Sequence, residues 1–260
     1  MLPVDSSRQR LVIKMNVSGN VYSVTDLGKV RATNEDYAGK RLNAYGQIMM
    51  VVCDGMGGRS RGDYASKLLG DSLLNSFNSF DKPIRKPKQM EKWLYKTINE
   101  VNRTLYEKSK EEGFEHMGTT LTVAILFENY LCYAQVGDSR LYAYQDDVLT
   151  QLTVDQTYVQ YLEHAHKLTK EQISSHPERH KLTNAIGMKY NANVEIKTIE
   201  YNKERLLLCS DGVYNNLNTS DLKSVLKSND LLERKGKQII NFANANGGSD
   251  NMAIVLWESH

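Results

Sequence analysis

Five aspartates recur at one kind of position in this sequence: after an apolar run, or beside glycine or asparagine. They are Asp36 in RATNEDY, Asp54 in VVCDGMGG, Asp138 in QVGDSR, Asp211 in LLLCSDGV and Asp250 in GGSDNM. Buried strands end at the edges of sheets, so side chains at those ends can converge on one cleft. Several carboxylates cannot share a dry cleft, because like charges repel and desolvation adds to the cost. A divalent cation relieves both problems, so the pattern favours a metal site.

The residue types indicate which class of metal such a site would hold. Hard cations such as Mg²⁺ and Mn²⁺ prefer oxygen ligands from carboxylates, backbone carbonyls and water. Glycine beside a ligand, as Gly55 is beside Asp54, lets the backbone carbonyl approach as well. The sequence has no compact cluster of histidines and cysteines, which argues against zinc. Each Asp-Gly or Asn-Asp pair alone is typical of an ordinary turn, and only the whole set points to a metal.

The segment VVCDGMGG, residues 51–58, first admits three interpretations: a phosphate-binding loop, an aspartyl nucleophile and a metal site. A nucleotide P-loop needs Lys-Ser/Thr after its glycines, and that pair is absent. An aspartyl-phosphate phosphatase needs Asp-x-Asp, and here Met56 occupies the second aspartate position. The remaining interpretation is a ligand position at which Asp54 and the carbonyl of Gly55 hold metal ions.

The composition is typical of one cytoplasmic domain. With 260 residues, four prolines and no Gly/Ser-rich linker, we expect a single domain over 1–260, with 1–20 as a lead-in segment. A net charge of +2 gives no reason to expect nucleic acid or a membrane as partner. No stretch resembles a signal peptide or a spanning helix. The unpaired Cys53, Cys132 and Cys209 lie in apolar stretches, as buried thiols do in a reducing compartment.

The elements that must position the aspartates are strands in runs and helices in pairs. Stretches rich in β-branched and aromatic residues predict strands at 21–26, 46–53, 119–127, 129–136, 140–145, 194–201, 205–210 and 252–257. Helical spacing predicts long helices at 61–80 and 88–112 and shorter ones at 155–165, 169–175, 219–228 and 230–245. This organisation is α+β, and we expect a central antiparallel β-sandwich flanked by helix pairs on both outer faces.

Eight motifs in order resemble one family. They are GKVRATNEDY, VVCDGMGG followed by GDYAS, MGTTLTVAIL, QVGDSRLYAY, QLTVDQTYV, HKLTNAIG, LLLCSDGVYNNL and GGSDNMAIVLW. From about residue 21 to 257 the chain is similar to the metal-dependent protein phosphatases of the PPM type (protein phosphatase 2C-like), in their compact bacterial form. The resemblance implies two bridged metal ions at one end of the sandwich and a flap over about 145–190. It also implies hydrolysis of phosphoserine and phosphothreonine in proteins.

The resemblance assigns a role to each aspartate. Asp36 and Asp54 match the ligands on opposite sides of a bridged pair of Mn²⁺ or Mg²⁺ ions, and the Gly55 carbonyl matches the backbone ligand. Asp211 and Asp250 match the carboxylates that hold the second ion. Two such cations share a water and lower its pKa toward neutrality, and the resulting hydroxide attacks phosphorus in line.

Other positions follow from the same resemblance. Asp138, together with Asp211, matches the carboxylate pair for a third, weaker ion. Arg31 matches the arginine that pairs with the substrate phosphate, for which its planar fork of donors is suited. Glu35 either orients metal-bound water or faces solvent, and Asn251 supports Asp250 or a turn.

The chain departs from the family pattern in the flap region. Gln156 and Thr157 stand where His-Ser is usual, His166 where Gly is usual, and Asn184 where Arg is usual. None of them is a metal ligand, so we expect altered substrate preference rather than lost chemistry. Other histidines of the region, His164, His176 and His180, are expected at helix ends or in solvent, although the last two could donate to a leaving group. Met56 stands where animal members carry a candidate acid histidine.

The function expected from the resemblance is that of a metal-dependent serine/threonine protein phosphatase. Its partners would be phosphorylated proteins and a cognate serine/threonine kinase of bacterial type. The alternative is a catalytically silent phosphatase-fold module that binds phosphoproteins or regulates a kinase. Silent members are expected to lose metal carboxylates, and all five are present here.

Overall fold

The fold is built around two antiparallel sheets, as seen in a computed structural model that describes residues 17–57, 61–165, 172 and 176–260. The first sheet has the order β1 (Gly19–Asp26), β11 (Met252–Ser259), β10 (Arg205–Cys209), β7 (Arg140–Gln145) and β8 (Val148–Gln151). The second has the order β2 (Asp36–Leu42), β3 (Ile48–Met56), β5 (Leu121–Phe127), β6 (Tyr130–Val136) and β9 (Glu195–Glu200), with the short β4 (Gly118–Thr119) paired to the end of β3.

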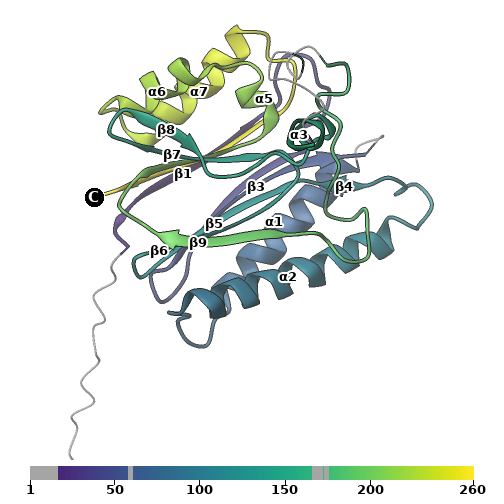
Figure 1. The fold of residues 1–260 in the computed structure, drawn as a ribbon, viewed down its shortest axis with the longest axis horizontal. Helices are drawn as coiled ribbons and strands as arrows, with labels where there is room; N and C mark the ends of the chain where they lie inside the picture. The colour runs from purple at the N-terminus through teal and green to yellow at the C-terminus, as the bar shows by residue number, and fades with distance from the viewer. Residues whose placement is uncertain (1–16, 58–60, 166–171, 173–175) are drawn as a thin grey trace, which may run out of the picture.

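Helices cover the outer faces of both sheets (Figure 1). The helices α1 (Gly62–Asn78) and α2 (Pro87–Lys108) lie over the second sheet, and α6 (Thr219–Lys227) and α7 (Leu232–Ala245) lie over the first. Two short helices, α3 (Tyr158–His164) and α5 (Asp211–Tyr214), lie near one end of the sandwich. The arrangement confirms the predicted α+β class with antiparallel sheets.

The central strand β3 shows why the sequence forms this layered structure. Its side chains alternate between two faces. Met49, Val51 and Cys53 are buried against the residues of α1 and α2, while Met50 and Val52 are buried between the two sheets. Because both faces of the strand are covered, its sequence is a continuous apolar run rather than an alternating one.

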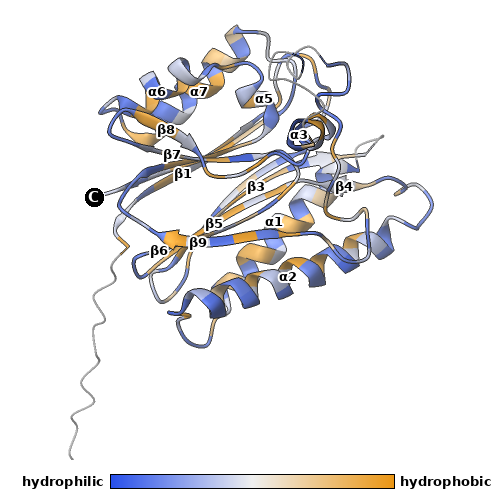
Figure 2. Cartoon of the chain, in the orientation of Figure 1, coloured by the Kyte–Doolittle hydropathy of each residue, from blue (hydrophilic) through white to orange (hydrophobic). Residues whose placement is uncertain are grey.

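Three apolar layers hold the elements together. One lies between the second sheet and α1 and α2, one between the two sheets, and one between the first sheet and α6 and α7. In α1 the residues Ala65, Leu69, Leu73 and Phe77 are buried at a spacing of one helical turn, which forms the stripe that faces the sheet. Figure 2 shows the same division, with apolar segments on the sheet sides of the helices and polar segments outside.

The predicted elements agree with the observed ones except at specific places. The strand β2 and the helix α5 were not predicted from the sequence, because DYAGKRL is too polar for a strand signal and DGVY is a single turn. The helix predicted at 169–175 lies almost wholly outside the described residues. The flap predicted at about 145–190 stays a prediction, because residues 166–171 and 173–175 are not among those described.

The cysteines and the helices agree with the expectations from composition. Cys53, Cys132 and Cys209 are all buried free thiols. Within the described ranges, every helix is too short or too polar to cross a membrane.

Candidate active site

Two predicted ligands lie side by side where strands β2 and β3 meet. Asp36 begins β2 and is paired directly with Asp54 in the register of the two strands. The hydroxyl of Ser210, which follows β10 of the other sheet, donates to Asp36 Oδ2 at 2.6 Å and accepts from the Ala253 amide at 2.8 Å. Ser210 therefore joins the two sheets at the position of these carboxylates, and sequence reasoning missed it.

The backbone around Asp54 is fixed by two threonines of the MGTT motif. The Asp54 amide donates to Thr120 Oγ1 at 2.9 Å, and the Asp54 carbonyl accepts from Thr119 Oγ1 at 3.0 Å and from the Thr120 amide at 2.8 Å. Thr120 Oγ1 also lies 2.7 Å from Ser139 Oγ, in the turn that carries Asp138. These bonds connect the end of β3 to that turn.

Gly55 lies where only glycine fits. A Cβ on Gly55 would lie 2.2 Å from the carbonyl oxygen of Gly62, at the start of α1, and 2.6 Å from that of Glu35. The Gly55 amide donates to that Glu35 carbonyl at 3.1 Å. The Glu35 side chain accepts a hydrogen bond from the Gly62 backbone, so Glu35 provides an acceptor for an N–H at the N-terminus of α1. Gly55 thus allows the helix to begin directly beside the Asp54 strand.

Asp211 and Asp250 come together through another close backbone approach. Asp211 is the first residue of α5, and a Cβ on the next residue, Gly212, would lie 2.0 Å from the carbonyl oxygen of Asn251. Asn215 Nδ2 donates to Asp211 Oδ2 at 3.1 Å. The start of α5 is therefore packed against the segment that carries Asp250.

The loop that carries Arg31 is held by Asn251. Asn251 Nδ2 donates to the carbonyls of Leu27 and Thr33 at 2.9 and 3.0 Å, and its Oδ1 accepts from the Glu35 amide at 2.9 Å. Arg31 Nη2 lies 2.8 Å from Asp250 Oδ2, and 53% of the Arg31 side chain is exposed. Asn251 therefore supports the whole loop, which is the turn-supporting role expected for it.

The electrostatics of the site are dominated by partly or wholly buried carboxylates, which lose part of their hydration in the fold. Desolvation, together with the charges of Asp211 and Asp250, raises the pKa of Asp36 to about 8, although the hydrogen bond from Ser210 opposes the rise. Burial and the neighbouring aspartates, Asp36 first, hold the pKa of Asp54 well above its usual range. Desolvation and the charge of Asp211 raise the pKa of Asp138 to about 7. Such a group of acids is stabilised by protons or by a bound cation.

The carboxylates are not preorganised as a metal shell. Within the described ranges, no group of three or more His, Cys, Asp or Glu side chains is arranged to hold an ion as it stands. Asp250 forms an ion pair with Arg31, and Asp36 accepts a hydrogen bond from Ser210. The chemistry of the donors nevertheless fits a hard cation, because they are carboxylate oxygens whose mutual repulsion a cation would neutralise.

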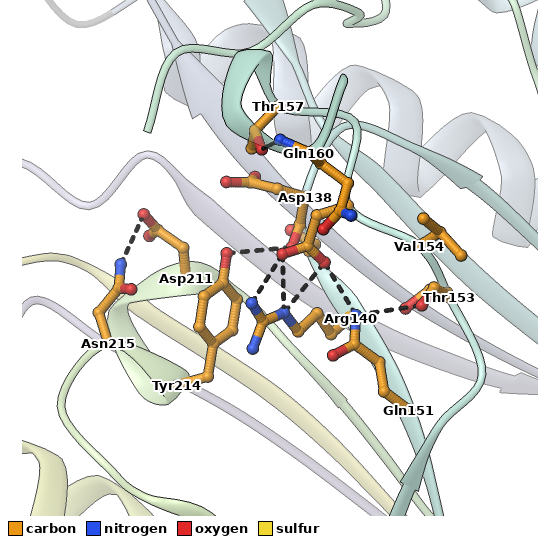
Figure 3. Close-up of polar contacts among 12 residues, drawn as sticks. Asp138, Arg140, Gln151, Thr153, Val154, Thr157, Gln160, Asp211, Tyr214 and Asn215 are labelled. Carbon is orange, nitrogen blue, oxygen red and sulfur yellow. Dashed lines mark hydrogen bonds and ion pairs between the residues drawn. The ribbon is translucent and has the colours of Figure 1, made fainter. Parts of the chain in front are cut away.

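A second layer of polar contacts, formed by Arg140, Asp155 and Tyr214, lies next to Asp138 (Figure 3). Arg140 donates from Nη2 and Nε to Asp155 at 2.6 and 3.0 Å, and its guanidinium lies 3.5 Å from the centre of the Tyr214 ring. The Tyr214 hydroxyl donates to the Asp138 carbonyl at 3.1 Å. Since Tyr214 ends the helix that Asp211 begins, this layer connects the positions of Asp138 and Asp211.

The positions that depart from the family pattern lie near this layer, except His166, which is outside the described residues. Thr157 caps α3 by accepting from the Gln160 amide, and Asn184 donates to Gln156 at 2.7 Å. Of the histidines, His164 ends α3, as predicted. His176 accepts from the Glu178 amide at 3.1 Å.

Comparisons with known proteins identify a matching family and similar proteins. The sequence profile described as Protein phosphatase 2C matches residues 29–256. The serine/threonine phosphatase stp of Listeria innocua is 37% identical over 237 residues, which cover 90% of this chain and 93% of that protein.

Solved structures show the same fold. The S. agalactiae serine/threonine phosphatase superposes with a TM-score of 0.89 at 28% identity, covering 93% of this chain and 100% of that one. Serine/threonine phosphatase Stp1 from Staphylococcus aureus superposes with a TM-score of 0.88 at 30% identity, covering 95% and 97%. With a profile match over most of its length and a relative of this identity and coverage, the chain belongs to the protein phosphatase 2C family of serine/threonine protein phosphatases.

Proposed function

We propose that this phosphatase uses its five strand-end aspartates and the Gly55 carbonyl to hold Mg²⁺ or Mn²⁺ ions at one end of the sandwich. Family membership implies dependence on metal, and the assignment of residues and ions is our own. Asp36, Asp54 and Gly55 would contribute to a bridged pair, completed by Asp211 and Asp250. Asp138 would contribute, with Asp211, to a third and weaker ion. The observation that carries the proposal is the convergence of partly buried carboxylates, Asp36, Asp54 and Asp211, whose pKa values are raised by desolvation and mutual repulsion.

The chemistry of phosphate ester hydrolysis gives each group a task. Bound divalent cations supply Lewis acidity, lower the pKa of water toward neutrality and offset charge on the phosphate. Arg31 binds the phosphate oxygens with the part of its guanidinium that Asp250 does not occupy. Thr120 and Ser210 fix the positions of Asp54 and Asp36. These hydrogen bonds restrain two of the five aspartates, which limits the reorganisation that must accompany the reaction.

The wider setting follows from the same assignment. The substrates are phosphorylated proteins, and we propose that a cognate serine/threonine kinase supplies them, because a phosphatase needs a kinase to make its substrate. We also propose that the chain acts as a single cytoplasmic domain and that the segment at about 145–190 forms a flap beside the site.

The proposal is tested by assaying the purified chain on a phosphothreonine peptide with Mn²⁺, with and without EDTA. Hydrolysis should require Mn²⁺ and stop in EDTA. The variant Asp211→Ala should lose turnover and weaken Mn²⁺ binding by calorimetry while melting cooperatively. Activity that persists in chelator would rule out the metal assignment. Mn²⁺ binding without hydrolysis would instead favour the silent phosphoprotein-binding module.

A further inference from the structure

Asp138 lies in a turn that needs bracing. It follows Gly137, whose φ of 95° is in the left-handed region, and only 5% of Asp138 is exposed. A Cβ on Gly137 would lie 2.7 Å from the Thr120 side chain, so no larger residue fits at this position. Glycine also has wide backbone freedom, so the turn has to be fixed by its contacts. The direction of the Asp138 side chain therefore depends on what holds the Gly137 backbone.

The side chain of Gln156 holds the amide side of that backbone, while Gln135 Nε2 donates to the Gly137 carbonyl at 3.1 Å. The backbone N–H of Gly137 donates to the side-chain oxygen Oε1 of Gln156 at 2.9 Å. The backbone N–H of Gln156 in turn donates to the Gly137 carbonyl at 2.9 Å. A backbone N–H can only donate, so the contact requires that the oxygen of the Gln156 amide group, not its nitrogen, faces the turn.

Asn184 fixes the orientation of Gln156. Its Nδ2 donates to Gln156 Oε1 at 2.7 Å and to the carbonyl of Asn193 at 2.7 Å, while Gln156 Nε2 donates to Glu195 Oε1 at 3.2 Å. The side-chain nitrogens of Gln156 and Asn184 both face acceptors, so these contacts fix the orientation of the two side-chain amide groups.

Backbone contacts beside this pair close the base of the segment between residues 156 and 184. The Thr183 amide and hydroxyl both donate to the Gln156 carbonyl, at 2.9 and 2.8 Å. Thr157 and Leu182 form a β-bridge next to it. Two positions within the predicted flap region of about 145–190 are thus joined at Gln156, and the Gln156 side chain connects this junction to Gly137.

We infer that Gln156 and Asn184 form an amide clasp that positions the Asp138 turn from the base of the predicted flap. Both residues stand where other types are usual in the family, and they contact each other, so the two departures belong together. The clasp residues are positioning residues, because they act on Asp138 through the Gly137 backbone. The inference rests on the proposed role of Asp138 as a ligand of the weaker cation, and it predicts that loss of the clasp weakens that cation alone.

The test uses the full chain and the variant Gln156→Met, which keeps the length of the side chain but removes its acceptor. In metal-free protein the Gly137 amide should exchange with deuterium roughly tenfold faster. In a calorimetric Mn²⁺ titration the weaker class of site should lose roughly five- to tenfold in affinity, as expected for the loss of one hydrogen bond, with the tighter class unchanged. Asn184→Leu should shift both readouts in the same direction.

Matched variants separate the clasp from general damage. Gln160→Met makes the same chemical change in α3, where the side chain contacts Glu163 instead of Gly137, and should behave as wild type. The exchange Gln156→Glu with Glu195→Gln conserves charge and all three hydrogen bonds, and should restore weak-site affinity.

Three results would overturn the clasp. They are unchanged weak-site binding in Gln156→Met, an equal loss in Gln160→Met, and wild-type protein with a single class of cation site. The last result would also remove Asp138 from the ligands while leaving Asp54 and Asp211 in place. Failure of the proposed metal assignment as a whole is distinct, because wild-type protein would then bind no Mn²⁺ at all.

Discussion

Arg31 and Asp250, 219 residues apart in the chain, meet at 2.8 Å between Nη2 and Oδ2. The contact ties the arginine proposed to bind phosphate to a proposed metal carboxylate. Because more than half of the Arg31 side chain stays exposed, the rest of its donor fork remains accessible to a phosphate. Under the proposed assignment, substrate binding and cation binding would therefore share this pair of residues.

Arg31→Ala should lower kcat/KM for a phosphothreonine peptide about 10- to 100-fold, since charge-assisted hydrogen bonds contribute about 1.5–3 kcal/mol. Arg31→Lys should give an intermediate loss, because a lysine keeps the charge and loses the fork. Steady-state kinetics at saturating Mn²⁺ measures both. Lys29→Ala, a basic residue removed from the same exposed loop, is the control and should stay within twofold of wild type. Equal activity of Arg31→Ala and wild type would exclude the phosphate contact.

Asp54→Asn should make the metal-free protein more stable and the enzyme inactive. Burial and the charges of the neighbouring aspartates hold the pKa of Asp54 above its usual range, so both disfavour its carboxylate, and a neutral amide removes that penalty. A gain of about 1–2 kcal/mol would raise Tm in EDTA by about 2–8 °C. The Tm increase caused by Mn²⁺ should shrink, and turnover should fall at least a hundredfold, which is about 2.7 kcal/mol of barrier.

Thermal melts in EDTA and in Mn²⁺ measure both predicted changes in Tm, the gain without metal and the smaller increase on adding Mn²⁺. Asp146→Asn is the matched control, since Asp146 is an exposed hairpin residue with positive φ, which asparagine tolerates. A lower Tm of Asp54→Asn in EDTA would contradict the view that the site is repulsive without a cation.

The pH dependence of stability should reverse when the cation is removed. The folded-state pKa of Asp36 is raised to about 8 from an ordinary value near 3.8, so its protonated form is favoured by folding. That contribution is fully present below about pH 4 and is lost as pH rises through about 8. In EDTA, Tm should therefore fall from pH 5.5 to 8.5.

With saturating Mn²⁺ the trend should weaken or invert, because protons compete with the cation for the same carboxylates. Differential scanning fluorimetry across this range tests both arms. Asp36→Asn should flatten the curve in EDTA. A Tm that rises with pH in EDTA in wild-type protein would show that Asp36 is already ionised at low pH.

Sequence reasoning predicted the parts of the fold that local pattern determines. The apolar run before Asp54 predicts a buried strand, and the motif around Asp211 predicts a strand end. The contacts between distant segments have no local signal. Ser210 meets Asp36 across 174 positions, and the pair of Gln156 and Asn184 shows only as two unusual residues. The polar β2 was missed for a related reason, since its pairing partner β3 rather than its own composition makes it a strand.

Arg140 tests whether the layer next to Asp138 contributes to stability. Only 23% of the Arg140 side chain and 13% of that of Asp155 is exposed, so Arg140→Met would leave a nearly buried carboxylate unpaired. Removing one partner of a buried pair costs about 3–5 kcal/mol. At the lower end, about 3 kcal/mol, Tm should fall by about 6–12 °C for a chain of this size.

Tyr214→Phe separates the two contacts of that ring. Phenylalanine keeps the stacking on Arg140 and loses only the hydrogen bond to the Asp138 carbonyl, so about 1 kcal/mol and a few degrees of Tm are expected. The double variant Arg140→Met with Asp155→Leu should recover most of the loss of Arg140→Met, because it leaves no unpaired charge. Additive losses in that double variant would mean that the Arg140–Asp155 pair contributes through packing and not through its charges.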